Sequence, residues 1–418
     1  MRTGFLTIAL AIGATVGAAS TTAAQTFAIT NARIHTVSGS VIERGTIIVQ
    51  NGRITAVGTN VTIPSGVQSI DATGKVVTPG LFDSHTGLGT VEIGAAAGSN
   101  DMSSATDHIT AAFNPLDNLN PFATSIAITR NEGITRAVVA PSAGASFIAG
   151  QGLIVDLADA GSSLTVHRNP VAIYANLGEN GAERTGGARA ANLLNLREVL
   201  QDARDYSTNR AAFDAGSRRE YAASRLDLEA LGPVVRGEIP LIVSVNRASD
   251  ILGALRFARE MNIKIILEGA AEGWMVAQEI ARTNVPVITN PLTNIPSFDA
   301  LGITLENATR LHAAGVTVAF ASFDTHNSRN LKQFAGNAVA HGMPFDAALR
   351  AITLTPARIF GLADRYGSIE AGKDADLVIW SGDPLELMTA VERVFIRGSE
   401  VRNNDRQKLL LERYRTIR

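Results

Sequence analysis

A short polar cluster follows an apolar segment near the first quarter of the chain. Residues 76–82 are mostly apolar, and Asp83, Ser84 and His85 come directly after them. An apolar strand that ends in ionisable groups is the way an α/β barrel builds an active site. A ring nitrogen of His85 could bind a metal ion, and a second ligand on the same face would stand two residues later. That position is Gly87, which has no ligand atom, so the metal-binding pattern is incomplete.

Alternating strand and helix patterns surround this segment. In the second half of the chain, short apolar runs are separated by amphipathic stretches, which predicts a parallel sheet with crossover helices. These runs lie at residues 241–246, 263–267, 285–289 and 316–320. Residues 146–157 indicate an additional β-excursion. Counting the earlier apolar runs, we find about seven convincing barrel strands, one short of a closed (β/α)8 barrel.

Both ends of the chain return to β-strand patterns. β-branched residues flank Asn51-Gly52, which is a strong signal for a two-residue hairpin. Strands on both sides of the barrel sequence indicate one small composite β-sandwich. The predicted fold class is α/β, a (β/α)8 TIM-like barrel plus a composite β-sandwich built from both chain ends. The predicted boundaries are 78–362 for the barrel, 25–77 with 363–404 for the sandwich, and 405–418 for a charged tail.

Composition places the chain among globular proteins. Hydrophobic residues make up 45% and charged residues 18% of its 418 residues. A net charge of -2 gives no reason to expect a nucleic-acid partner. The chain has no cysteine, which excludes disulfide bonds and thiolate metal ligands.

The first 24 residues have the pattern of a secretory signal peptide. Arg2 is followed by an apolar run from Phe5 to Ala19, and Thr22-Ala23-Ala24 supplies small residues for cleavage. We expect cleavage after Ala24 and a periplasmic or secreted protein. No later segment is long and apolar enough for a membrane span in the mature chain.

Several motifs resemble those of the amidohydrolase superfamily, the metal-dependent (β/α)8-barrel hydrolases. The first-strand pattern of that family is Pro-Gly-x-x-Asp-x-His-x-His. Pro79, Gly80, Asp83 and His85 match it, and Gly87 departs from it. The closing blocks around Thr353-x-x-Pro356-Ala357-Arg358 and residues 367–378 are similar to the family as well. The imidazolonepropionase-like and dipeptidase-like members resemble the chain most.

The resemblance implies site residues at the ends of particular strands. The fourth strand should give a bridging lysine or glutamate, but its nearest acid is Glu179, after the strand. The fifth should give a histidine, and residues 243–246 have none. The sixth offers Glu268, and the eighth offers Asp324 as general base and metal ligand, with His326 as a candidate fourth ligand.

This resemblance leads to two functional hypotheses. The first is a secreted hydrolase of amide or cyclic amide C–N bonds with a reduced metal site. Its catalytic residues would be Asp324 and His85, and its metal ligands His85, Glu268 and Asp324. The cofactor would be one divalent metal, with zinc favoured over manganese or iron, or no metal at all. The alternative is a catalytically degenerate barrel that binds a small ligand or a protein partner. A homo-oligomer is one of the oligomeric states left open.

Each of these residues also has a structural interpretation. Asp324 could cap the helix that follows it, and Glu268 could be a buried carboxylate satisfied by arginine or backbone N–H groups. His85 could be held by Asp83 or Asp324. Four arginines are candidates for orienting a substrate carboxylate, although each could equally belong to a structural ion pair. They are Arg184, Arg189, Arg247 and Arg329.

Overall fold

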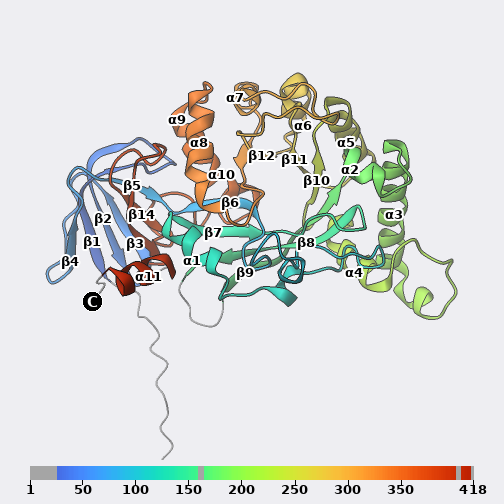
Figure 1. The fold of residues 1–418 in the computed structure, drawn as a ribbon, viewed down its shortest axis with the longest axis horizontal. Coiled ribbons are helices and arrows are strands. Elements are labelled where there is room, and N and C mark those ends of the chain that lie inside the picture. The colour runs from blue at the N-terminus through green and yellow to red at the C-terminus, as the bar shows by residue number, and fades with distance from the viewer. Residues whose placement is uncertain (1–25, 159–163, 402–405, 416–418) are drawn as a thin grey trace, which may run out of the picture.

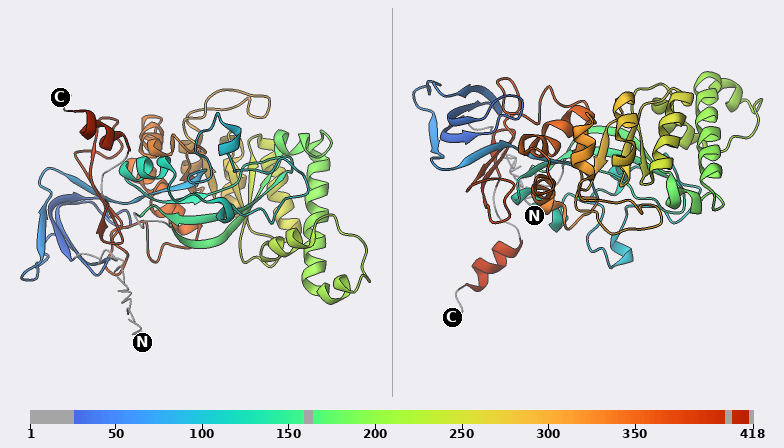
Figure 2. Two further views of the ribbon diagram at one scale, coloured as in Figure 1. Left: turned by 60° about the horizontal axis from the view of Figure 1, so that its bottom comes forward. Right: turned by 90° about the horizontal axis from the view of Figure 1, so that it is seen from above.

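The structure is a computed structural model that describes residues 26–158, 164–401 and 406–415. The predicted signal peptide lies outside these residues. Two sheets organise the fold, and Figures 1 and 2 show the smaller one at one end of an elongated body whose larger part carries the helices. Among the described residues, no helix is both long and apolar enough to cross a membrane.

The larger sheet has eight strands in the described part of the chain, and they follow one another in chain order. They are β6 (Leu81–Thr86), β7 (Ile134–Val139), β8 (Ile148–Asp156), β9 (Thr165–Asn176), β10 (Leu241–Val245), β11 (Ile265–Gly269), β12 (Val287–Thr289) and β13 (Val318–Phe320). The sheet nearly closes into a barrel, because Thr86 pairs with Asp324 in an isolated parallel bridge and the Phe323 N–H donates to the His85 carbonyl.

One strand departs from the predicted (β/α)8 pattern. β8 runs antiparallel to both β7 and β9, whereas the other barrel pairs are parallel. Residues 140–147 link β7 to β8, and this link is too short for the crossover helix that a parallel pair needs. The barrel is therefore TIM-like but not a regular (β/α)8 repeat.

Every barrel strand contributes to one apolar cluster inside the barrel. Its members from β6 to β13 include Phe82, Val138, Ile154, Tyr174, Ile242, Ile266, Ile288 and Ala319. Such a packed interior leaves the strand ends, not the barrel centre, as the place for a site.

The helices cover the outside of the barrel, where a second apolar cluster lies between them and the strands. They are α1 (Thr124–Asn131), α2 (Gly178–Glu183), α3 (Arg189–Asp214), α4 (Arg225–Val235), α5 (Ala248–Met261), α6 (Ala277–Thr283), α7 (Asn307–Ala313), α8 (Leu331–Ala340), α9 (Phe345–Ala351) and α10 (Leu354–Ile359). Short 3₁₀ helices lie at Ala97–Ser99, Pro115–Asn118, Gly273–Val276 and Ser328–Asn330.

The smaller sheet, which also has eight strands among the described residues, draws them from both chain ends. Its order is β16-β15-β14-β5-β1-β2-β3, and β4 pairs with β1. The bounds are β1 (Phe27–Ile34), β2 (Ile42–Gln50), β3 (Arg53–Gly58), β4 (Gln68–Asp71), β5 (Val76–Pro79), β14 (Leu377–Trp380), β15 (Val391–Ile396) and β16 (Ser399–Glu400). The predicted hairpin is present, with Asn51 and Gly52 both at positive φ between β2 and β3.

The predicted β-sandwich is not confirmed. The strands form one sheet that curls around its own apolar core, and Phe27 of β1 stacks on Phe395 of β15 with ring centroids 4.6 Å apart. Strand twist allows such a sheet to bury one face without a second sheet. The domain boundaries stay predictions, although only Gly80 separates β5 in this sheet from β6 in the barrel.

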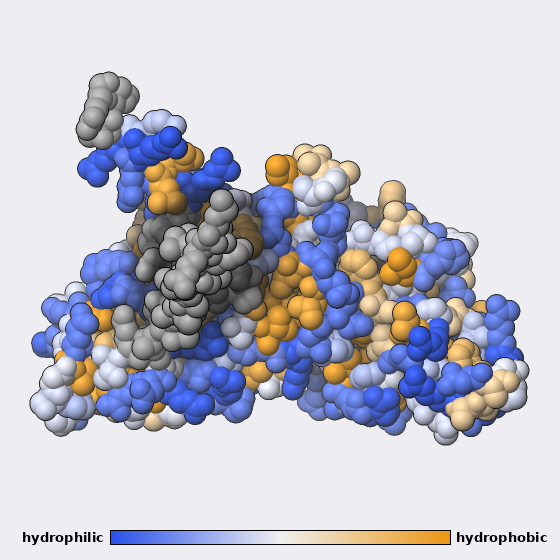
Figure 3. All heavy atoms as spheres, turned by 90° about the horizontal axis from the view of Figure 1, so that it is seen from below, coloured by the Kyte–Doolittle hydropathy of each residue, from blue (hydrophilic) through white to orange (hydrophobic). Residues whose placement is uncertain are grey.

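The last described helix, α11 (Arg406–Tyr414), has no buried residue. It projects from the body in Figure 3 and carries both hydrophilic and hydrophobic side chains. Residues 405–418 were predicted as a charged tail, and the described part of that segment is a solvated helix.

Candidate functional site

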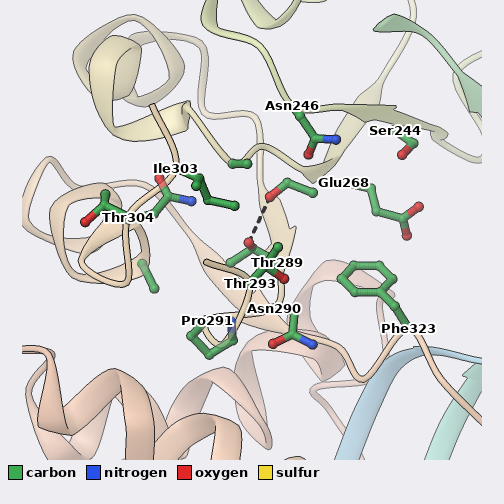
Figure 4. Close-up of a pocket in the computed structure, with 14 residues that line it drawn as sticks. Ser244, Asn246, Glu268, Thr289, Asn290, Pro291, Thr293, Ile303, Thr304 and Phe323 are labelled. Atoms are coloured by element: carbon green, nitrogen blue, oxygen red, sulfur yellow. Dashed lines mark hydrogen bonds between the residues drawn. The ribbon is translucent and has the colours of Figure 1, made fainter. Parts of the chain in front are cut away.

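A pocket lies at the carboxyl ends of four neighbouring barrel strands, β10 to β13. Its empty volume is about 630 Å³. Figure 4 shows Glu268 together with Ser244, Asn246 and Asn290 around this pocket. The other lining residues are Gly269, Ala271, Thr289, Pro291, Thr293, Ile303, Thr304, Asn307, Ala308 and Phe323. This is the end of the barrel where sequence patterns placed the site.

A hydrogen-bonded ion pair joins two of the predicted site residues. Nδ1 of His85 on β6 lies 2.6 Å from Oε1 of Glu268 on β11, and the two side chains are only 10% and 9% exposed. Burial by itself lowers the pKa of His85, but the Glu268 carboxylate more than offsets this and raises the pKa above its usual value. The structure therefore brings together a histidine favoured in its charged form and a carboxylate that lines the pocket.

Asp324 is engaged elsewhere. Its Oδ1 accepts from the backbone N–H groups of His326 and Asn327 at 2.8 and 3.1 Å, and its Oδ2 accepts from the Asn327 side chain at 2.9 Å. Burial raises the pKa of Asp324, but these hydrogen bonds outweigh burial and leave the pKa below its usual value. The carboxylate stabilises its own turn and does not cap the helices that follow, whose N-cap residues Asn327 and Asn330 have no side-chain capping bond.

Two further polar groups lie beside the pair: Asp83, which the sequence offered only as a partner for His85, and Tyr174, which it did not single out. Asp83 is fully buried, accepts from the N–H groups of Ser322 and His85, and burial raises its pKa to about 6. Tyr174 packs edge-on against the His85 ring, with centroids 5.4 Å apart, and its buried hydroxyl has no hydrogen-bond partner among the described residues. A tyrosine within the apolar stretch 171–175 of β9 was the available signal for Tyr174.

The pocket wall also contains a polar row that sequence reasoning passed over. Ser244 on β10 is the register partner of Glu268 on β11, and Asn246 follows Ser244 on the same face. The sequence did contain a signal. Ser244 and Asn246 are polar residues at alternate positions in an otherwise apolar run that begins at Leu241. The family resemblance implied only a histidine at this strand end.

Comparison with known proteins relates this chain to a protein family. Residues 243–401 match the amidohydrolase family. The fold is similar to the crystal structure of an amidohydrolase from Thermotoga maritima MSB8, with a TM-score of 0.82 and 28% identity over 90% of this chain and all of that one. The chain therefore carries an amidohydrolase family domain.

Two curated proteins are similar to this amidohydrolase-family chain over most of its length. Amidohydrolase tasK of Hapsidospora irregularis is 25% identical over 85% of this chain. Adenine deaminase 2 of Shouchella clausii (strain KSM-K16) is 26% identical over 87% of it. The chain spans only 39% and 57% of these relatives.

The metal set that the family resemblance implied is not assembled in this chain's described residues. Within the described ranges, no three His, Cys, Asp or Glu side chains come together in a way that could hold a metal ion. His85 and Glu268 meet, but the Asp324 carboxylate is hydrogen-bonded within its own turn, and His326 is exposed. A zinc site needs about three protein ligands, so the donors present do not fit the group.

The space for a second first-strand histidine is filled. A Cβ atom added at Gly87 would lie 2.5 Å from Oγ1 of Thr325 and 2.6 Å from Sδ of Met102. Met102 comes from the long segment after β6, so a distant part of the chain has closed this position. The packing around Gly87 therefore leaves no room for the histidine that the family pattern has at this position.

Replacing Gly87 with alanine is expected to lower the free energy of unfolding by about 1–3 kcal/mol, because the added methyl overpacks a filled site. Gly94→Ala is the matched control, since Gly94 is exposed and a Cβ there would meet nothing within 4 Å. Urea denaturation of the two variants measures the difference. Equal stability of the two would show that Met102 and Thr325 yield without cost.

The predicted substrate-orienting arginines do not line the pocket. Arg184 donates to the carbonyl of Gly144 and to Asn180, and Arg189 bridges Asp250 and Asp299. Arg247 and Arg329 are exposed. None of the four is placed to hold a substrate carboxylate in this pocket.

Proposed function

We propose that this chain is a secreted amidohydrolase-family hydrolase that cleaves amide or cyclic amide C–N bonds with a reduced site. The observation that carries the proposal is the buried His85–Glu268 pair at a pocket formed by the carboxyl ends of the barrel strands. The pair supplies one acid and one base, and acid–base catalysis of amide hydrolysis uses both.

The residues present support a plain sequence of steps. Glu268 accepts a proton from a water molecule, and the resulting hydroxide adds to the amide carbonyl carbon. His85, whose pKa is raised, donates a proton toward the leaving nitrogen as the C–N bond breaks. The hydroxyl of Ser244 and the side-chain amide of Asn290 are donors in the same pocket for the developing oxyanion.

The alternative is a degenerate barrel that binds a small ligand or a protein partner without turnover. Two observations favour it. Asp324 accepts hydrogen bonds within its own turn, and Met102 fills the space beside Gly87 where the family places its second histidine. Secretion is a separate part of the proposal and rests on residues 1–24 alone. Mass spectrometry of the exported protein would locate its N-terminus.

Turnover of an amide panel distinguishes the two functions. Wild-type protein is incubated with N-acyl amino acid amides, cyclic imides and hydantoins, and released amine or acid is measured. Hydrolysis of at least one class supports the enzyme, whereas no turnover together with ligand binding supports the degenerate barrel.

The Asp324→Asn variant tests where the general base lies. Asparagine retains the Oδ1 acceptor for both backbone N–H groups, so we expect turnover to change by less than about threefold. A loss of about a hundredfold or more would restore Asp324 as the base that the family resemblance implied.

A further inference from the structure

We infer that the pocket at the ends of β10–β13 takes a small uncharged molecule that presents N–H groups to Glu268, Ser244 and Asn246, and that it rejects carboxylate-bearing analogues. That this molecule is a substrate rests on the proposed function. The binding preference itself does not require turnover.

The lining is polar but almost without charge. Of the described residues around the pocket, Glu268 alone is ionisable, and the remaining polar side chains are hydroxyls and amides. The Glu268 carboxylate is already neutralised by His85 at 2.6 Å. The pocket therefore offers no net charge to a ligand, and an ion entering it would lose hydration without gaining a counter-ion.

The hydrogen bonds inside the protein determine which groups are left for a ligand. Asn307 is fully used, because its oxygen accepts from the Trp274 N–H and its amide donates to the Ala270 carbonyl. Thr289 donates to the Gly269 carbonyl, which is the interaction dashed in Figure 4. These groups hold the pocket wall together.

Three acceptors remain at the ends of β10 and β11, beside the donors that Ser244 and Asn290 offer. Within the described part of the chain, neither the Ser244 hydroxyl nor Oε2 of Glu268 is hydrogen-bonded to the protein. The amide of Asn246 lies 3.5 Å from Asp299, and its carbonyl oxygen is left for another donor. Three oxygens on adjacent strand ends complement a ligand with more than one N–H group, as an amide, imide or urea has.

Apolar side chains also line the pocket. Phe323, Pro291, Ile303 and Ala308 line the pocket, and Phe323 is 38% exposed. The enclosed part of the pocket is about 170 Å³, below the usual range for sites of drug-sized ligands, so it suits only a small molecule. A compact molecule with a polar edge and one apolar side, such as a cyclic amide, matches this lining.

Matched ligand pairs test this preference. Calorimetry compares N-acetyl-L-alaninamide with N-acetyl-L-alanine, and hydantoin with hydantoin-5-acetic acid, so that each pair differs in a carboxylate. We expect the neutral member of at least one pair to bind about tenfold or more tightly than its acid. Equal or tighter binding of the acids, or no binding by either neutral compound, overturns the inference.

A variant places the ligand in this pocket. Ser244→Ala should weaken binding of the neutral compound about three- to tenfold, because one hydrogen bond is lost. Ser249→Ala, at an exposed position on α5, is the matched control and should bind as the wild type does. Unchanged binding in Ser244→Ala contradicts this placement. Neutral binding without hydrolysis would overturn the proposed function and leave the pocket assignment standing.

Discussion

Replacing Glu268 with glutamine is expected to lower turnover of an amide substrate by about 10²–10⁴-fold. Glutamine keeps the shape of the side chain but cannot accept a proton from water at neutral pH. It also removes the carboxylate that raises the pKa of His85. The measurement is kcat and kcat/KM for the most active substrate of the panel.

Glu279→Gln is the matched control for this variant. Glu279 is exposed on α6 and does not line the pocket, so the same substitution there should leave turnover unchanged. Circular dichroism and thermal unfolding verify that both variants are folded. Full activity in Glu268→Gln would show that turnover does not need the His85–Glu268 pair, and it would favour Asp324 as the general base.

Replacing Arg136 with methionine is expected to cost about 3–5 kcal/mol of stability, because it leaves buried carboxylates without their main counter-ion. Arg136 on β7 is 2% exposed and pairs with Asp156 on β8 and with Asp376 just before β14, the latter at 2.9 Å. Its guanidinium also lies over the Tyr366 ring, 3.3 Å from the centroid. Arg136 thus joins the barrel to the smaller sheet.

The pKa shifts of Asp376 and Asp156 show the same dependence on Arg136. Burial raises the pKa of Asp376, and Arg136 opposes that rise. Burial also acts to raise the pKa of Asp156, but Arg136 and His167 outweigh it and hold the pKa below its usual value. Without Arg136, these two carboxylates would face each other with only part of their compensation, from His167 and Arg397.

Urea denaturation of Arg136→Met and of Arg393→Met measures this effect. Arg393 makes a partly exposed pair with Glu400 on the smaller sheet, and its loss should cost no more than about 1 kcal/mol. The double variant Arg136→Met, Asp376→Leu should recover part of the loss, since one unpaired carboxylate is removed with the arginine. If Arg136→Met were as stable as Arg393→Met, Arg136 would have no special role between the sheets.

Much of the barrel could be predicted from the sequence because its signals are local. Apolar runs of strand length alternate with amphipathic helices after residue 237, and β10 to β13 lie where those runs predicted them. The Asn51-Gly52 hairpin followed from turn chemistry in the same way. Strand ends also identified His85 and Glu268, which do lie together at the pocket end of the barrel.

Other features depend on how distant strands meet. The pairing of distant strands makes β8 antiparallel and joins the strands from both chain ends into one curled sheet. Local periodicity does not encode which strands pair. The filling of the Gly87 position by Met102 depends on the course of a long loop whose residues carry little pattern.

By itself, then, the sequence determined the family, the barrel-like order of the strands and the strand ends that carry polar groups. The tertiary structure decided what those groups do. His85 and Glu268 are 183 residues apart and pair because near-closure of the barrel places β6 opposite β11. Asp324 stands at an equally suitable strand end, yet its carboxylate accepts N–H groups two and three residues away. Backbone donors so close in the chain are always within reach of a short side chain, whereas partners across the barrel meet only once the whole sheet has folded.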